Sequence, residues 1–309
     1  MTQLAFVFPG QGSQQLGMLA DVAAQYPLVR QVFGEASDAL NLDLWQLCQE
    51  NEAELNKTEY TQPALLTASI ALWRVWQAFD GAKPQYLAGH SLGEYSALVA
   101  AGVLSLADGV RLVSLRGRLM QQAVPAGLGA MAAILGLEDA EVLAACQSAA
   151  GVGVVEAVNF NAPAQVVIAG ETEAVQAAMK NATERGAKRA LILPVSVPAH
   201  SSLMRPAAEK LADALENMDF NAPVIPVVQN VTARVEADVS AIRQALVAQL
   251  YSPVKWVATV DWLAAQGVSR MIECGPGKVL CGLNKRINKG LACESLETTS
   301  SLVNALAGN

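Results

Sequence analysis

The 309-residue sequence predicts an α/β protein with a parallel-sheet core and an inserted ferredoxin-like (βαββαβ) subdomain. Two observations carry this prediction. In the outer parts of the chain, short apolar runs that end at glycine-bearing turns alternate with helical patterns, as in a parallel sheet. The middle of the chain instead shows four strand patterns and two helical patterns in the order βαββαβ. We therefore expect a discontinuous core of residues 1–125 and 198–309 around a subdomain of residues 126–197.

Three buried core strands are expected over 4–8, 85–88 and 270–274, because each is a short apolar run stopped by glycine or proline. The intervals between them show helical spacing of apolar residues. The expected helical segments are a long region over 29–47, a helix that begins after Thr61-Gln62-Pro63 and ends at Asp80-Gly81, and helices over 107–123, 203–218 and 242–250.

The subdomain is expected to contain strands over 129–135, 152–158, 165–169 and 189–197, with helices over 138–149 and 171–185. Residues 159–163 are expected to form the loop between its two central strands. In parallel sheets, binding sites lie at the carboxyl ends of the strands, where the glycine-bearing turns of the core fall.

The composition excludes several classes of protein. The chain is 52% apolar and 16% charged, which excludes a disordered or fibrous protein. A net charge of −7 argues against a nucleic-acid partner. Two uncharged stretches, 1–20 and 119–137, are long enough to cross a bilayer, but their proline, glycine and glutamine residues argue against any membrane span. With only two histidines, a His-rich metal site is excluded.

The five cysteines are scattered and contain no CxxC pair, which predicts reduced thiols in a cytoplasmic protein. Cys274 and Cys281 lie in apolar surroundings and are expected to be buried spectator thiols. The N-terminal segment carries no basic region, so no signal peptide is expected.

The residues Gly89-His90-Ser91-Leu92-Gly93 fit the pattern G-x-S-x-G between an expected strand and an expected helix. Glycine on each side of a serine permits the tight turn that exposes its hydroxyl, and the N–H groups that begin the helix can stabilise an oxyanion. Ser91 is therefore predicted to be a nucleophile. An ordinary turn is the alternative, because the pattern alone is weak.

A serine nucleophile needs a base. His90 adjoins Ser91, and neighbouring side chains diverge in a sharp turn, so packing or hydrogen bonding is expected of His90. His200 follows an expected strand and Pro198, which forces an extended approach, and it is the predicted base. No carboxylate between Ser91 and His200 marks a strand end that faces the site. A dyad oriented by a backbone carbonyl would fit this absence.

A glycine-rich loop, residues 8–14, follows the first expected strand. It fails as a phosphate loop, because its glycines do not match G-x-G-x-x-G and Met18-Leu19 stand where lysine and serine or threonine are needed. The loop is instead predicted to lend a backbone N–H to an oxyanion hole, beside that of Leu92. A plain strand-to-helix turn is the alternative.

The helix expected over 107–123 carries three arginines. Arg111 and Arg118 share one face, which is the expected solvent face, and Arg116 is offset from Arg118 by about 200°. An arginine turned inward needs an anionic partner. Arg116 therefore belongs either to a structural ion pair or to a receptor for a carboxylate, and the sequence favours neither.

Together these residues resemble the malonyl-CoA:acyl carrier protein transacylases of bacterial fatty-acid synthesis. The order and spacing of the matching motifs cover essentially the whole chain. The motifs are FPGQGSQ at 8–14, TQPAL at 61–65, AGHSLGEY at 88–95, RG at 116–117, VNFN at 158–161, QVVIAG at 165–170, SVPAH at 196–200 and GPGKVL at 275–280.

The resemblance implies a hydrolase-like α/β core and a ping-pong reaction that needs no cofactor, because the coenzyme A thioester is an activated substrate. Ser91 would take the malonyl group as an ester, and His200 would act as general base and acid. The N–H groups of Gln11 and Leu92 would form the oxyanion hole. Arg116 would pair with the malonyl carboxylate.

In that family a backbone carbonyl orients the histidine, and the matching residue here is Gln249. The acceptor would be the phosphopantetheine thiol of acyl carrier protein, and the enzyme is expected to be a monomer. Because such carriers are acidic, docking to this acidic chain needs a local basic patch. The densest candidate is formed by Lys285, Arg286 and Lys289, with Lys278 nearby and Lys188 and Arg189 as further contributors. A solvated helix end is the alternative.

Three rival functions remain open on the sequence. A serine esterase or thioesterase would share the acyl-enzyme and differ in its second acceptor, and a buried Arg116 would give no advantage on neutral esters. A free-standing acyltransferase of a polyketide assembly line would use another carrier. A catalytically inert scaffold protein would require an unreactive Ser91.

Overall fold

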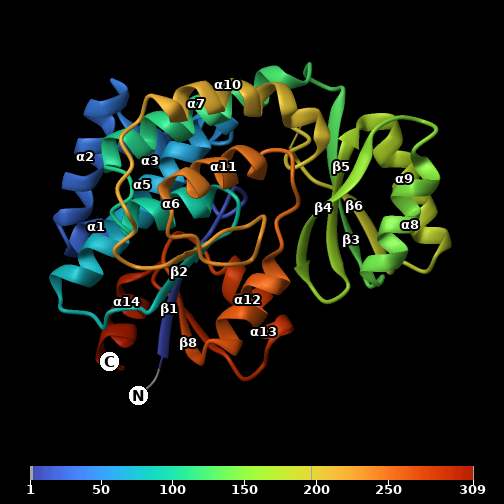
Figure 1. The fold of residues 1–309 in the computed structure, drawn as a ribbon. Helices are drawn as coiled ribbons and strands as arrows, with labels where there is room; N and C mark the ends of the chain where they lie inside the picture. Colours follow the sequence, from blue (N-terminus) through green and yellow to red (C-terminus); the bar gives the residue numbers. More distant parts are fainter. Residues whose placement is uncertain (1–2, 196, 309) are drawn as a thin grey trace.

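The computed structural model describes residues 3–195 and 197–308, which form two sheets with their helices (Figure 1). The larger sheet has the order β7-β2-β1-β8-β9, and all of its pairings are parallel. Its strands are β7 (Val227–Val228), β2 (Tyr86–Gly89), β1 (Gln3–Phe8), β8 (Val268–Glu273) and β9 (Ala292–Ser295). The three expected core strands are therefore confirmed, with bounds shifted by one or two residues.

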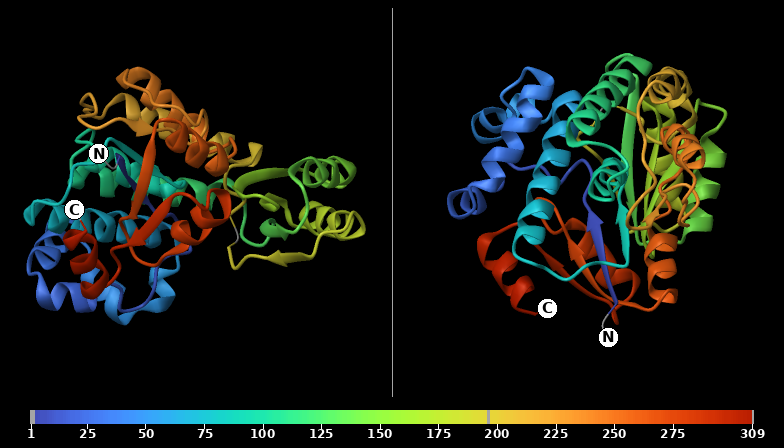
Figure 2. Two further views of the ribbon diagram at one scale, coloured as in Figure 1. Left: turned by 90° about the horizontal axis from the view of Figure 1, so that it is seen from below. Right: turned by 60° about the vertical axis from the view of Figure 1, so that its left-hand side comes forward.

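Successive side chains of a strand point to opposite faces of the sheet, and the core strands are buried on both. Helices therefore cover both faces. Phe6 and Phe8 of β1 pack with the larger group of helices, and Ala5 and Val7 pack on the other side with Trp256 and its neighbours. Figure 2 shows these layers from two further directions. The helices of the first face are α1 (Ala20–Gln25), α2 (Leu28–Leu40), α3 (Leu44–Glu50), α4 (Glu52–Leu55), α5 (Thr58–Ala78), α6 (Leu92–Ala100), α7 (Leu106–Ala123), α10 (Arg205–Glu216), α11 (Val239–Gln249) and α14 (Thr299–Ala307). Those of the second face are α12 (Trp256–Ala265) and α13 (Val279–Ile287).

Helix α5 begins before Pro63, whereas the sequence predicts a start after it. The proline was interpreted as a helix start, yet it lies in the second turn, and the helix begins at Thr58. Helix α7 crosses α5 at Gly117, where a Cβ atom would come within 2.7 Å of the Glu59 Cα. This close approach brings the end of α7 against the start of α5.

The smaller sheet is antiparallel, with the order β4-β5-β3-β6. Its elements follow the expected βαββαβ order: β3 (Gly129–Leu135), α8 (Asp139–Ala149), β4 (Val155–Ala162), β5 (Gln165–Glu171), α9 (Thr172–Glu184) and β6 (Arg189–Ile192). Ala132 and Ile134 pack under the helices, and Met131 packs on the opposite face with Val158 and Val167. The second face is the one turned toward the larger sheet, because its Met131 and Val167 border the same cavity as Ser91, which follows β2.

Several expected bounds in this sheet are wrong. Residues 159–162 were expected in a loop and belong to β4, because register shifts let the strand continue to Ala162. Strand β6 ends at Ile192 rather than at 197, since its pairing with β3 stops there. Ser196 lies outside the described residues. The sequence also missed β7, which is two residues long, and β9, which is half exposed.

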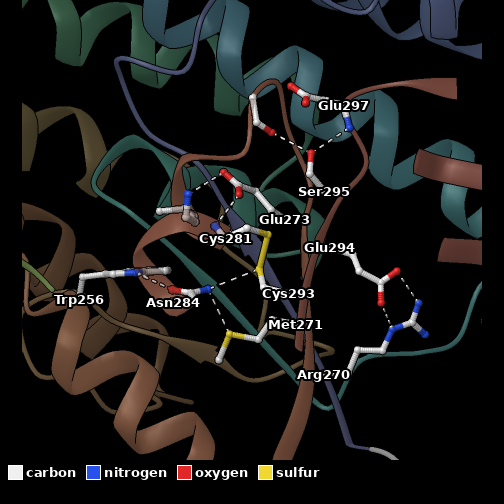
Figure 3. Close-up of a disulfide and its surroundings, with 12 residues drawn as sticks. Trp256, Arg270, Met271, Glu273, Cys281, Asn284, Cys293, Glu294, Ser295 and Glu297 are labelled. Carbon is white, nitrogen blue, oxygen red and sulfur yellow. Dashed lines mark hydrogen bonds and ion pairs between the residues drawn. A yellow bond between two sulfur atoms is a disulfide. The ribbon is translucent and has the colours of Figure 1, made fainter. Parts of the chain in front are cut away.

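The prediction of reduced thiols is wrong for Cys281 and Cys293, because Cys281 of α13 forms a disulfide with Cys293 of β9 (Figure 3). Strand β9 pairs with β8 beside α13, and this packing sets the two Cα atoms 5.1 Å apart. Cys281 is half-buried. Cys274 is a free, buried thiol, as expected, and burial raises its pKa. No helix of the described residues is long and apolar enough to cross a membrane.

The disulfide closes a loop of 12 residues, and a bridge over a loop of this size stabilises a fold by about 3 kcal/mol. We therefore expect Cys293→Ser to lower the free energy of unfolding by about that amount in non-reducing buffer. Denaturant unfolding with and without a thiol reductant measures the effect, and the reductant should leave the variant unchanged. Equal unfolding midpoints for the reduced and non-reduced parent protein would contradict the prediction.

Candidate active site

Ser91 lies in a sharp turn between β2 and α6, with a positive φ of 53°. The turn is crowded: a Cβ atom at Gly89 would overlap the carbonyl group of Gly93, and one at Gly93 would overlap the carbonyl oxygen of Phe8. Glycine is required at both positions for this reason. The pattern G-x-S-x-G is therefore a steric consequence of bringing the start of α6 against the end of β1.

His200 faces Ser91, with 2.7 Å between the Ser91 Oγ and the His200 Nε2. The His200 Nδ1 lies 2.7 Å from the backbone carbonyl oxygen of Gln249, the last residue of α11. A carbonyl only accepts hydrogen bonds, so Nδ1 carries the proton and donates it. The lone pair of Nε2 is then free to accept the Ser91 hydroxyl proton. The structure thus brings Ser91, His200 and Gln249 into the arrangement that the resemblance implied.

The environment of His200 keeps its imidazole neutral. Burial, together with the nearby positive charge of Arg116, lowers the pKa of His200 from 6.5 to about 3. The side chain is 2% exposed. At neutral pH this histidine is therefore an unprotonated hydrogen-bond acceptor toward Ser91.

Arg116 is buried near the end of α7 and points at the same serine. Its Nη1 donates to Gln62 Oε1 at 2.8 Å. Its Nη2 donates to Gln249 Oε1 at 2.9 Å and to Ser91 Oγ at 3.2 Å. All of these acceptors are neutral, and no ion pair of Arg116 is found among the described residues. Of the two alternatives that the sequence left open, the structural ion pair is not observed.

Gln11 and Leu92 border the same cavity as Ser91. Leu92 is the first residue of α6, so its N–H has no acceptor inside the helix. Gln11 lies in the loop after β1, and its side chain donates to Thr58 Oγ1 at 3.3 Å. Two backbone donors from separate loops are therefore available near the Ser91 hydroxyl.

The cavity lies between the two sheets. Its polar end holds Ser91, His200 and Arg116, and its walls are largely apolar. The walls come from the smaller sheet, the segment that follows it and α13, through Met131, Val167, Leu193, Val195, Val279, Leu280 and Leu283. No cluster of three possible metal ligands is found in the described part of the chain.

His90 points away from Ser91, as expected. Its Nε2 lies 2.7 Å from Asn161 Oδ1 on β4, and its ring packs against Trp256. Desolvation lowers the pKa of His90. His90 therefore occupies a packing and hydrogen-bonding position that joins the turn of Ser91 to the smaller sheet.

The three basic residues of the expected docking patch, Lys285, Arg286 and Lys289, are exposed on α13 and just beyond it. Arg286 contacts the smaller sheet region through Gln165 Oε1 and the Pro163 carbonyl oxygen. The patch lies on the helix whose first residues line the cavity, and it does not contact Ser91.

Sequence reasoning gave no role to Gln62, Glu94 and Asn230, which contact the site residues directly. Gln62 and Glu94 stand inside the TQPAL and AGHSLGEY motifs, so a signal for them was present. Asn230 follows β7, a strand too short to be recognised, and no local pattern marks it.

Comparisons with known proteins agree with this geometry. The acyl transferase domain family matches residues 5–293. Malonyl CoA-acyl carrier protein transacylase of Escherichia coli K12 is 60% identical over 307 residues, 99% of each chain. The Bacillus subtilis transacylase is 47% identical over 94% of this chain and 92% of its own.

Solved structures give the same result. The malonyl-CoA:acyl carrier protein transacylase of Xanthomonas oryzae has a TM-score of 0.98 and 57% identity, covering 100% of this chain and 99% of its own. A malonyl-transacylase in complex with a type II PKS acyl-carrier protein has a TM-score of 0.99 and 55% identity, with full coverage of both chains.

A half-buried serine at the cavity, paired with a neutral histidine in a fold shared over the whole chain with acyltransferases, defines an acyltransferase of the acyl transferase domain family. The identities place the chain in a narrower group. It belongs to the malonyl CoA-acyl carrier protein transacylase family, and the resemblance predicted from the sequence is confirmed.

Because both histidines have lowered pKa values, we expect neither imidazole to titrate near 6.5. At about pH 5 an exposed histidine is almost wholly protonated, whereas His200 should stay neutral. Nuclear magnetic resonance of the imidazole C–H protons reads this directly, since the chain has two histidines. A His90→Gln variant assigns the signals, and a midpoint near 6.5 for His200 would contradict the prediction.

Proposed function

We propose that the chain transfers the malonyl group from malonyl-CoA to the phosphopantetheine thiol of acyl carrier protein, and so supplies malonyl groups for fatty-acid synthesis. One observation carries the proposal: the Ser91–His200 pair shares its cavity with Arg116, a buried cation for which residues 3–195 and 197–308 offer no ion pair. A site built for neutral acyl groups would gain nothing from that cation. A dicarboxylic half-thioester supplies both a carbonyl for Ser91 and a carboxylate for Arg116.

In the first half-reaction, His200 Nε2 accepts the Ser91 proton while Oγ attacks the thioester carbonyl. The N–H groups of Gln11 and Leu92 stabilise the negative oxygen of the tetrahedral intermediate. His200 then returns the proton to the sulfur as the carbon–sulfur bond breaks. Coenzyme A leaves as the thiol, and malonyl-Ser91 remains.

In the second half-reaction the carrier thiol gives its proton to His200 and attacks the malonyl-Ser91 ester. The proton passes to Ser91 Oγ as the ester bond breaks, which restores the enzyme. Throughout, the Gln249 carbonyl holds the His200 Nδ1–H and stabilises the imidazolium less than a carboxylate would. Arg116 fixes the malonyl carboxylate by paired donors.

Exposed Lys285 and Lys289, with Arg286 beside them, are the proposed docking patch for the acidic carrier. They lie at the end of α13 and just beyond it, and the first residues of α13 line the cavity, so a carrier bound there can extend its phosphopantetheine arm to Ser91. We also propose that residues 1–125 and 198–309 form one unit and 126–197 a second. Each holds its own main hydrophobic cluster.

We further propose that the enzyme works as a monomer in the cytoplasm and without a cofactor. Three of the five cysteines, Cys48, Cys146 and Cys274, are free thiols, which supports a cytoplasmic location, whereas the Cys281–Cys293 disulfide is of a kind that reducing cytoplasm would open. A thioester already carries the activation that a metal or redox group would otherwise supply.

A carrier of a polyketide assembly line is the second candidate acceptor. The observation that favours it is the close structural match to a malonyl-transacylase in complex with a type II PKS acyl-carrier protein. Both candidates use the same chemistry at Ser91. Specificity constants measured with a fatty-acid carrier and a polyketide carrier decide between them.

Radiolabelled malonyl-CoA is expected to label the protein at Ser91. When carrier protein is added, the labelled malonyl group should pass from Ser91 to the carrier's thiol. Peptide mapping locates the label, and Ser91→Ala is the control that should take none. An enzyme that releases its label mainly to water would be a thioesterase. An unlabelled Ser91 would refute the acyl-enzyme.

Arg116→Ala is expected to cost malonyl transfer about 2–5 kcal/mol of transition-state stabilisation, because the malonyl carboxylate loses its partner in a desolvated site. The loss is measured as the fall in the specificity constant kcat/KM. Acetyl transfer should fall much less, since acetyl has no carboxylate. Arg118→Ala is the matched control, because Arg118 is an exposed arginine of the same helix. Equal losses for malonyl and acetyl transfer would rule out the carboxylate role.

A further inference from the structure

One buried carboxyl group beside the site has no part in the chemistry described above. Glu94 lies on the first turn of α6, three residues after Ser91, and its side chain is fully buried. Its Oε2 accepts two hydrogen bonds of 2.9 Å, one from the Asn230 backbone N–H and one from Gln249 Nε2. Its Oε1 has no partner among the described residues. A single oxygen therefore joins the segment after β7 to the end of α11.

Asn230 in turn holds the N-terminal side of the turn of Ser91. Its Oδ1 accepts the Ser91 N–H at 2.7 Å, and its Nδ2 donates to the Gly89 carbonyl oxygen at 2.6 Å. The backbone of Ser91 has a positive φ, a conformation that costs about 1–3 kcal/mol and persists only where surrounding contacts determine it. The Asn230 amide supplies two such contacts, to the two peptide groups that lead into Ser91.

Gln249 connects the same network to the base and to the cation. Its Nε2 donates to the Ser91 carbonyl oxygen at 3.1 Å as well as to Glu94. Its Oε1 accepts from Arg116, and its own carbonyl oxygen accepts from His200. Because Gln249 orients His200 and also touches the backbone of Ser91, a shift of Gln249 would change the distance between Oγ and Nε2.

We propose that Glu94 and Asn230 are positioning residues that hold Ser91 and Gln249 in the register needed for proton transfer between Ser91 and His200. The inference rests on the proposed function for the identity of that step. The part proposed for the carboxyl of Glu94 is that of a double hydrogen-bond acceptor, since Oε2 makes both bonds. The variant Glu94→Gln separates this part from the electrostatic interaction of Glu94 with Arg116. Burial raises the pKa of Glu94 to about 7, and its carbonyl oxygen can accept in either protonation state.

Four variants test this role. Glu94→Ala removes the acceptor, and Glu94→Gln keeps an acceptor oxygen without the charge. Asn230→Asp keeps the volume and the acceptor for Ser91 but loses the donor to Gly89. Gln229→Ala is the matched control: Gln229 is the neighbouring buried amide, and its side chain bonds to Val227 rather than to the site.

The measurements are kcat and KM per active site, with sites counted by malonyl labelling, and the rate at which a fluorophosphonate modifies Ser91. Misplacement of a reacting group by about 1 Å can cost about 100-fold, so we expect Glu94→Ala and Asn230→Asp to lower kcat by about 10- to 100-fold. KM for malonyl-CoA should stay within about twofold, because no substrate contact is lost. Glu94→Gln should recover most of the activity, and Gln229→Ala should match the parent protein.

A kcat per active site equal to that of the parent in Glu94→Ala and Asn230→Asp would overturn the proposal, since the network would then only stabilise the fold. A Glu94→Gln variant as slow as Glu94→Ala would overturn the acceptor role. If Glu94→Ala does not fold, Asn230→Asp and the fluorophosphonate rates decide. That reagent needs a positioned Ser91–His200 pair but no malonyl recognition, so its rates test the positioning even if malonyl transfer fails as the function.

Discussion

Ser91 has a backbone conformation that residues other than glycine rarely adopt, and the rest of the site is built around it. This turn places the hydroxyl against His200 and Arg116, and the helix that begins right after it leaves the N–H of Leu92 without an acceptor inside the helix. The strain is compatible with folding for two reasons. Gly89 and Gly93 lack the Cβ atoms that would clash in the turn. The side chain of Asn230 bonds to the two peptide groups that lead into Ser91, and Gln249 Nε2 bonds to the carbonyl oxygen of Ser91 itself. An ordinary turn between β2 and α6 would need neither the two glycines nor a buried amide 139 residues away in the chain.

The parallel sheet explains how distant segments meet at this turn. Strands β1, β2 and β8 run in the same direction, so the loops that follow them open at one edge. One loop brings Gln11, the second brings Ser91, and the third leads into α13, which forms one wall of the cavity. The smaller sheet closes the opposite wall through Met131 and Val167, and the chain leaves it just before His200. The position of the insert in the sequence therefore delivers the base to the nucleophile.

The sequence was sufficient for those parts of the molecule whose cause is local. The core strands, the βαββαβ order and the turn of Ser91 all follow from short runs and glycine spacing. It failed where the cause is tertiary. Pro63 lies inside α5, and β9 is visible only as a partner of β8. The disulfide joins cysteines 12 residues apart that only the packing of α13 against β9 brings together. Asn230 and Gln249 act through atoms that any amide could offer, so no residue pattern distinguishes them; Gln249 came from the resemblance alone.

The electrostatic field of Arg116 inside the cavity links recognition of the substrate to the basicity of His200. Arg116 is a buried cation with neutral partners, and its charge helps to lower the pKa of His200 to about 3. Under the proposed function, the malonyl carboxylate pairs with Arg116 and cancels much of that charge. The pKa of His200 then rises by the part that Arg116 contributes, while the larger lowering that comes from burial remains, and the imidazole becomes a stronger base for the Ser91 proton than it is beside the unpaired cation. An acetyl group leaves the cation unpaired and His200 weakly basic. Selection for malonyl therefore acts twice through one arginine, once in binding and once in the proton transfer that follows.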